Sequence, residues 1–148
     1  MLDNIKNIKI LEKIIKDKTF ITVVKKPLDN LTFDFLNEFS NELKKLKRVY
    51  EYPDLVYLIF WCRRNKIEKL KDNINNNENR LGRGLIFHIC PSNIPTNFIY
   101  SFFFGLLSGN SNIVKMPTKH SNQKEIILKV LDILFKKKKF IQFKESNY

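Results

Sequence analysis

Apolar residues in the first half of the chain recur at the three- and four-residue spacing of amphipathic helices. Residues 1–17 carry one such stripe between lysines and acids. A second stripe lies at Leu36, Phe39, Leu43 and Leu46. A third helix is expected over about residues 54–70, because Pro53 suits a first helical turn, where its missing N–H would be unpaired anyway. The pattern therefore predicts a mostly helical N-terminal region over residues 1–80.

Two stretches of this region depart from the helical period. Residues 19–24 are mostly β-branched or aromatic and are followed by Pro27, so they predict a short strand. Residues 71–80 hold five asparagines and show no apolar period, which is typical of a loop or linker.

The second half begins with a strand pattern and a helix pattern. Residues 84–90 form a continuous apolar run, which is typical of a strand buried on both faces of a parallel sheet. Residues 96–108 predict a compact apolar helix, in which Gly105 lets the backbone approach the sheet. Gly109 supplies the stop signal of this helix.

A second strand and a second helix follow. Residues 112–116 predict the strand, and Ser121 is expected to cap a helix with its apolar residues on one face. Residues 140–143 predict the start of a third strand. This order of strands and helices predicts the α/β fold class and the start of a Rossmann-like parallel sheet. Ligands of such sheets bind at the carboxyl ends of the strands, here near residues 90–93 and 115–119.

The chain is strongly basic, with 27 Lys and Arg against 15 Asp and Glu and a net charge of +12. That charge suggests an anionic partner such as nucleic acid, a phosphorylated ligand or a membrane surface. Only five of the basic residues are arginines, however, and arginine is preferred for base and bidentate phosphate contacts. The chain is also rich in Ile, Asn and Phe. This bias across polar and apolar classes indicates A+T-rich coding rather than selection for a nucleic-acid surface.

The two cysteines, Cys62 and Cys90, lie in apolar surroundings without the close spacing of zinc or redox sites. No metal site or disulfide framework is expected, and both thiols are interpreted as structural filler. The start of the chain lacks a continuous apolar signal core, and the apolar runs at 55–62 and 98–107 are shorter than the roughly 20 residues of a membrane span. We therefore expect a soluble, cytoplasmic protein.

One stretch of the second half is similar to a known family. Residues 82–101 are GRGLIFHICPSNIPTNFIYS and residues 105–115 are GLLSGNSNIVK. With YPDL at 52–55 and FWCRRN at 60–65, this stretch resembles the long-chain acyl-CoA reductase family, the reductase component of the bacterial luciferase fatty-acid reductase complex. That family is a branch of the aldehyde dehydrogenase superfamily, whose cofactor domain opens with the same order of strand, Pro-x-Asn loop, helix, Gly-Asn and strand.

The resemblance implies an incomplete aldehyde dehydrogenase-like fold, with a partial NAD(P)-binding domain over residues 81–148. It implies NADPH-dependent reduction of a long-chain fatty acyl-CoA, or of an acyl group delivered by a partner subunit, to the aldehyde through a cysteine thioester. Asn93 matches the superfamily Asn whose side-chain amide helps form the oxyanion hole. The alternative is an Asn that only turns the loop or caps the next helix. Pro91 and Ser92 of the same loop are expected to contact the cofactor.

Two lysines are candidates for binding the cofactor. In one alignment Lys115 corresponds to the superfamily Lys that binds the adenine ribose. In another, aligned on Pro117, Met116 takes that position and Lys119 falls where NAD-preferring relatives carry a Glu. An acid there would repel a 2′-phosphate, whereas Lys115 and Lys119 would attract it, so NADPH rather than NADH is expected. The alternative is that both lysines belong to a solvated loop.

The chain, at 148 residues, is shorter than the several hundred residues that the family implies. In the family the nucleophilic cysteine lies far downstream, beyond Tyr148. We therefore expect an N-terminal fragment without the nucleophile, arising from a truncated gene, a frameshifted copy or a pseudogene. The full-length family is expected to be oligomeric.

Two other interpretations stay open. One is a non-catalytic basic module that binds an anionic partner through the lysine run at 136–139, although such runs are usually solvated faces. The other is a remnant that pairs with further subunits of a reductase complex through the apolar helix at 55–62, which a buried core explains more simply.

Overall fold

The computed structural model describes residues 21–72 and 80–148, which contain six α-helices and two parallel strands. In chain order the elements are α2 (Asn30–Lys44), η1 (Lys47–Glu51), α3 (Pro53–Trp61), α4 (Arg64–Asp72), β1 (Leu85–Ile89), α5 (Asn97–Leu107), β2 (Ser111–Lys115), α6 (Asn122–Phe135), η2 (Lys138–Phe140) and α7 (Ile141–Glu145). The predicted mixed α/β class is confirmed. The helix predicted over residues 1–17 lies outside the described residues, as does most of the loop predicted over 71–80.

Helix α2 forms where the second apolar stripe predicts a helix. The Asp29 carboxylate accepts a hydrogen bond from the backbone N–H of Thr32 (3.0 Å), which caps the first turn. The first three apolar positions of the stripe are buried, whereas the fourth, Leu46, lies past the end of the helix at Lys44. The prediction is confirmed except at this last position.

The single helix predicted over residues 54–70 is wrong, because two shorter helices take its place. Pro53 occupies the first turn of α3 as expected, but this helix stops at Trp61 and α4 starts at Arg64. The side-chain oxygen of Asn37, on α2, accepts a hydrogen bond from the Arg64 backbone N–H (3.2 Å). A neighbouring helix thus supplies the cap of α4, and the break lets both short helices pack against α2.

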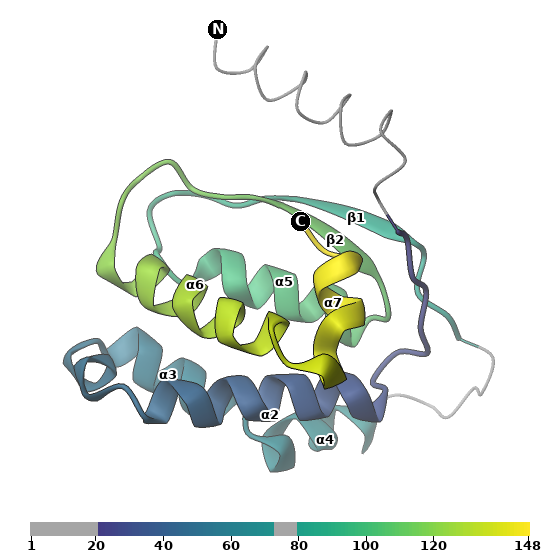
Figure 1. Cartoon of the computed structure of the whole chain (residues 1–148), viewed down its shortest axis with the longest axis horizontal. Coiled ribbons are helices and arrows are strands. Elements are labelled where there is room, and N and C mark those ends of the chain that lie inside the picture. Colours follow the sequence, from purple (N-terminus) through teal and green to yellow (C-terminus); the bar gives the residue numbers. More distant parts are fainter. Residues whose placement is uncertain (1–20, 73–79) are drawn as a thin grey trace, which may run out of the picture.

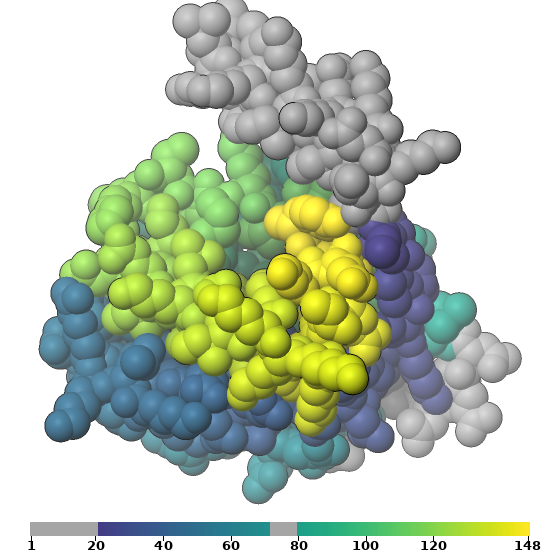
Figure 2. All heavy atoms as spheres, viewed as in Figure 1, coloured from purple at the N-terminus to yellow at the C-terminus, as the bar shows by residue number. Residues whose placement is uncertain are grey.

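The hydrophobic core lies between the helices. Buried residues of α2 and α3 form one cluster with those of α5 and α6. At its centre the Phe35 ring meets the rings of Phe103, Phe140 and Phe143, with centroids 6.5, 5.1 and 4.9 Å apart. Figure 2 shows the C-terminal residues (yellow) packed between α6 (yellow-green) and the first described residues (purple). Both halves of the chain therefore contribute to this core.

The third strand predicted at residues 140–143 is wrong, because the chain forms η2 and α7 there. Phe140 and Phe143 stand three residues apart and are both buried in the core, which requires helical spacing rather than the alternation of a strand. The chain reaches the sheet after α7, where Asn147 forms an isolated parallel bridge with Asn112 of β2 and Tyr148 exchanges backbone hydrogen bonds with Asn112 and Val114.

Strands β1 and β2 pair in parallel as predicted, with Leu85 opposite Ser111 and Ile89 opposite Lys115. Helix α5 connects them and covers one face of the sheet, and the labelled helices lie below both strands in Figure 1. On the opposite face, Leu85, Phe87 and Ile89 expose 44, 43 and 73% of their surface. The prediction of a strand buried on both faces is therefore wrong, since only alternate residues of β1 reach the helices.

The strand predicted over residues 19–24 is wrong for its described part, which starts at residue 21 and has no regular secondary structure. The backbone of this segment forms hydrogen bonds with a side chain of β2 rather than with the backbone of a neighbouring strand. The Val23 backbone N–H donates to the Ser111 hydroxyl (2.8 Å), and this hydroxyl donates to the Val23 carbonyl (3.0 Å). Further along, the Lys25 N–H donates to the carbonyl of Gly109 (2.9 Å). This segment thus runs past the loop between α5 and β2.

Two glycines act as the sequence predicts. A Cβ at Gly105 of α5 would lie 1.8 Å from the side-chain oxygen of Asn112, so only glycine allows the helix to lie this close to the sheet. Gly109 has a φ of +80°, a left-handed conformation that ends the helix.

Candidate functional site

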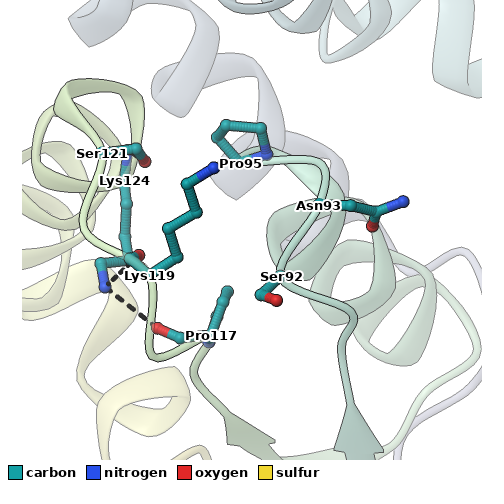
Figure 3. Close-up of a pocket in the computed structure, with 7 residues that line it drawn as sticks. All are labelled: Ser92, Asn93, Pro95, Pro117, Lys119, Ser121 and Lys124. Atoms are coloured by element: carbon teal, nitrogen blue, oxygen red, sulfur yellow. Dashed lines mark hydrogen bonds between the residues drawn. The ribbon is translucent and has the colours of Figure 1, made fainter.

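A shallow hollow lies between the loop after β1 and the loop after β2 (Figure 3). Its volume is about 40 Å³. That is room for only a few water molecules, so a larger ligand group would lie partly outside it. Its lining residues are Ser92, Asn93, Pro95, Pro117, Lys119, Ser121 and Lys124. The two loops that follow the parallel strands thus meet at the carboxyl edge of the sheet, where ligands of such sheets bind.

Ser92 and Asn93 come from the loop after β1, and both side chains are exposed. In Figure 3 the Ser92 hydroxyl lies between the two loops, whereas the Asn93 amide points away from the other labelled residues. Pro91 is exposed and does not line the hollow. One loop therefore presents a hydroxyl and an amide in different directions.

Lys119 and Lys124 line the other side of the hollow. Lys119 extends across it toward Pro95 (Figure 3). The Lys124 ammonium donates to the backbone carbonyls of Pro117 (3.0 Å) and Lys119 (3.1 Å). These two bonds tie the loop after β2 to the first turn of α6.

Helix α6 starts where the sequence predicts, because the Ser121 hydroxyl accepts a hydrogen bond from the Lys124 backbone N–H (3.2 Å). Sequence reasoning missed Lys124. The sequence feature that could have identified it is its position three residues after the N-cap Ser121, from which a long side chain can fold back over the preceding loop.

Lys115 lies apart from the hollow. It is the last residue of β2 and stands opposite Ile89, so both side chains belong to the sheet face that α5 does not cover. The structure therefore brings Lys119 together with Ser92 and Asn93, and it leaves Lys115 and Pro91 outside the lining of the hollow.

The hollow is cationic. Two lysines line it and no carboxylate is among its lining residues. Glu125, in the first turn of α6, is engaged with His120, whose Nε2 lies 2.7 Å from its carboxylate oxygen. Lysine ammonium and serine hydroxyl groups are suited to binding a phosphate group.

A polar network that the sequence did not predict lies between the sheet and α5. The Asn112 amide nitrogen donates to the Asn147 side-chain oxygen (2.7 Å), so its own oxygen is the acceptor for His88 Nε2 (2.8 Å). Nδ1 of His88 is then free to accept the hydroxyl proton of Ser101 (2.7 Å). With both ring nitrogens engaged, His88 joins β1 to β2 and to α5 and serves as a structural residue.

Neither cysteine is placed for nucleophilic chemistry. Burial raises the pKa of the Cys62 thiol well above its usual value. Burial also raises the pKa of Cys90, although a hydrogen bond with Ser101 partly opposes the shift. Both thiols are therefore protonated near neutral pH, which agrees with their interpretation as structural.

The lysine run at 136–139 is joined to acidic residues of the fold. The Lys137 ammonium lies 2.7 Å from the Glu38 carboxylate, and the Lys139 ammonium lies 2.8 Å from the Asp34 carboxylate. Both acids belong to α2, so these ion pairs hold the run against that helix. This arrangement disfavours a free basic tail that captures an anionic partner.

Within residues 21–72 and 80–148, no helix has the length and apolar character needed to cross a bilayer. The same residues contain no group of three or more His, Cys, Asp or Glu side chains arranged to hold a metal ion.

Comparison with known proteins identifies one family. The model of the family described as acyl-CoA reductase (LuxC) matches residues 42–139, about two thirds of the chain. The matched residues include β1, α5, β2, α6 and every residue that lines the hollow. No curated protein and no solved structure matches the chain. With the match covering well over half of its residues, the chain belongs to the acyl-CoA reductase (LuxC) family.

Proposed function

We propose that this chain takes part in the NADPH-dependent reduction of a long-chain fatty acyl-CoA to the fatty aldehyde. In this proposal residues 81–148 are the first part of a Rossmann-like, NAD(P)-binding domain in an aldehyde dehydrogenase-like fold. The observation that carries the proposal is the cationic hollow at the carboxyl edge of two parallel strands, within the part of the chain that matches the family. In the same proposal the reaction takes place in the cytoplasm, and the acyl group comes from acyl-CoA or from an acyl-transferring subunit.

The residues of the hollow fit a nucleotide that carries a phosphate on its ribose. Lys119 supplies a charge across the hollow, and Ser92 supplies a hydroxyl from the facing loop. Lys124 holds the loop carbonyls rather than a ligand, so its role is to position Lys119. Lys115 lies on the uncovered face of the sheet, from which it adds a more distant positive charge. NADPH, when bound, supplies the hydride for the reduction.

Asn93 is proposed as the oxyanion donor. Its exposed amide points away from the lysines, so a substrate carbonyl on that side could accept its N–H while a phosphate occupies the hollow. A neutral amide suits this role, because it stabilises developing negative charge without a proton transfer.

The nucleophile of this proposal lies outside residues 1–148. The raised pKa values of Cys62 and Cys90 support this placement, since a thioester forms from a thiolate.

The test is nucleotide binding by the full chain, measured as the rise in melting temperature with NADPH, NADH and 2′,5′-ADP. NADPH and 2′,5′-ADP are expected to raise it more than NADH does. Lys119→Ala should erase the difference, and Lys119→Glu should reverse it in favour of NADH, because a carboxylate repels the 2′-phosphate. Lys129→Ala, on the exposed side of α6, is the matched control and should behave like the parent chain.

Equal shifts with NADPH and NADH would contradict the phosphate role of the hollow. A preference for NADPH that persists in Lys119→Ala but disappears in Lys115→Ala would move the phosphate site to the uncovered face of the sheet.

A further inference from the structure

A second hollow, of about 200 Å³, lies among α5, β2, α6 and the pair Asn147 and Tyr148, and we propose that it binds the alkyl chain of a fatty acyl-CoA. We call it the alkyl hollow. Its apolar walls include Phe98, Phe102, Val114, Leu128, Leu131 and Phe135. The inference rests on the proposed function for the choice of an acyl-CoA as the source of the chain, and it adds the place where that chain is held.

The lining of the alkyl hollow favours an apolar ligand group. Its described lining residues include no charged side chain. The Asn147 amide is engaged by the protein, since its oxygen accepts from Asn112 and its nitrogen donates to the Phe143 carbonyl, both at 2.7 Å. The Tyr148 hydroxyl donates to the Glu145 carbonyl (3.1 Å). Walls of this kind offer few hydrogen bonds to water, so an apolar group is the better occupant.

The size of the alkyl hollow suits part of a straight alkyl chain. An apolar cavity of about 150 Å³ holds the six carbons of benzene, so 200 Å³ has room for roughly eight carbons. Leu128 and Tyr148 expose 42 and 44% of their surface and mark the mouth, whereas Phe98 and Ile99 of the lining are buried. A longer chain therefore leaves its remaining carbons and its head group outside.

The alkyl hollow adjoins the cationic hollow. Met116 lines the first, and the next residue, Pro117, lines the second. On α6, Leu128 of the alkyl hollow follows Lys124 of the cationic hollow by four residues, which is about 6 Å along the helix. A long acyl chain held here can therefore place its head group near the carboxyl edge of the sheet, where the reaction is proposed.

A second copy of the chain is a poorer occupant than an acyl chain. A hollow of this volume admits only one or two side chains of a partner. A stable dimer, in contrast, buries about 800 Å² on each partner. A run of methylene groups needs no flanking surface of that extent.

Binding of straight-chain carboxylates to the full chain, measured by isothermal titration calorimetry, tests the proposal. The affinity should rise about fourfold with each methylene added from butanoate to octanoate, because each buried methylene contributes a similar free energy. Beyond about eight carbons the rise should stop, because the hollow is full. Octanoyl-CoA should compete with octanoate, whereas CoA alone should not.

Val114→Phe fills part of the alkyl hollow. It should weaken octanoate binding by about tenfold and leave the melting temperature unchanged or higher, because added apolar volume in a cavity is accommodated without overpacking. Leu128→Trp, at the exposed mouth, should weaken binding to a similar extent and covers the case in which Val114→Phe disturbs the fold. Ile133→Trp is the matched control, because Ile133 lies on the same helix, is equally exposed (43%) and does not line the hollow.

The proposal fails if the affinity is independent of chain length, or if both hollow variants bind octanoate like the parent chain. Octanoate binding without competition by octanoyl-CoA would make the hollow a site for free fatty acids instead. Binding that weakens as the protein concentration rises would mean that a second copy fills the hollow. The rise in melting temperature with NADPH, measured on the same protein, separates the two proposals: a chain that responds to NADPH but binds no octanoate overturns this inference alone.

Discussion

At the scale of single residues, two buried polar atoms have no hydrogen-bond partner within the described chain, the Lys25 ammonium and the Tyr100 hydroxyl. A buried polar group without a partner costs the free energy of its lost hydration. Burial also raises the pKa of Tyr100, so its hydroxyl remains protonated at all physiological pH values. Both groups therefore oppose folding at the positions where they lie.

Tyr100→Phe is expected to stabilise the protein by about 1 kcal/mol, because it removes the unpaired hydroxyl and keeps the ring. The ring itself packs edge-on against Trp61, with centroids 5.2 Å apart, and this contact is unchanged by the substitution. Urea unfolding measures the effect. Tyr57→Phe, at an exposed position, serves as the control and should change the free energy of unfolding by less than about 0.5 kcal/mol.

Lys25→Met is also expected to stabilise the protein, by about 1 kcal/mol at pH 7, because a charged ammonium is buried there. Burial lowers the pKa of Lys25 below 10.5, although the charge of Asp29 partly opposes the shift. The Phe143 ring, 3.9 Å from the ammonium, recovers part of the cost.

The sign of the pH dependence follows from this lowered pKa. The folded chain releases the proton more readily than the unfolded chain, so the parent protein gains stability as the pH rises toward and through 10.5. The advantage of Lys25→Met should therefore shrink over that range in urea titrations. Lys26→Met, at the exposed neighbouring position, is the control for the loss of one lysine charge.

At the scale of elements, helix α2 is joined by ion pairs to two other parts of the fold. Asp34 meets Arg64 of α4 (2.5 Å) and Lys139 of η2 (2.8 Å). The hydrogen bond from Lys139 is the main cause that lowers the pKa of Asp34, and burial partly opposes it. The two oxygens of the Asp34 carboxylate thus each form one ion pair, one with α4 and the other with η2.

Asp34→Asn tests this junction. A lowered carboxylate pKa gives stability that is present above about pH 4 and is lost as the pH falls through the folded pKa. The substitution should therefore cost about 0.5–1 kcal/mol at pH 7, and this cost should shrink as the pH falls below about 4, measured by urea unfolding over that range. Asp132→Asn, in an exposed pair with Lys136, should have a smaller effect at either pH.

The elements show which parts of the fold a sequence can predict. Pro53, Gly109 and Ser121 mark helix ends by local chemistry, so those ends were predicted. The break before Arg64 depends on Asn37 of another helix, and no local pattern reveals it. Helices η2 and α7, where a strand was predicted, likewise depend on the packing of Phe140 and Phe143 against Phe35 of α2.

For the candidate site, the sequence predicted which loops meet but not the contacts of the individual lysines. The loops that carry Ser92 and Lys119 were expected to meet, because the carboxyl ends of parallel strands share an edge. The separation of Lys115 from Lys119 arises because Lys115 is the last residue of β2, on the face that α5 does not cover, whereas Lys119 lies in the loop that follows. The contacts of Lys124 depend on the path of the loop after β2, which the sequence does not specify.

At the scale of the whole molecule, the placement of both thiols predicts that this chain does not itself form an acyl thioester. Incubation with a long-chain fatty acyl-CoA should add no acyl mass to the intact protein, because burial keeps the thiols of Cys62 and Cys90 protonated. Intact-mass spectrometry measures this. Alkylation of both thiols in urea is the control that they are reduced and reactive once exposed. An acyl adduct that Cys90→Ala removes would place the nucleophile at the end of β1.

Strand β2 also sets the order in which this molecule can fold. Its residue Ser111 bonds to Val23, 88 positions earlier, and Asn112 bonds to Asn147, 35 positions later. Contacts of such long sequence separation form slowly, because closing the intervening loops costs entropy before any contact repays it. At about 5–20 residues per second, roughly 2–7 s of synthesis separate Asn112 from Asn147. During that time β2 is an unpaired edge on one side, and it is in this interval that the growing chain is most exposed to aggregation.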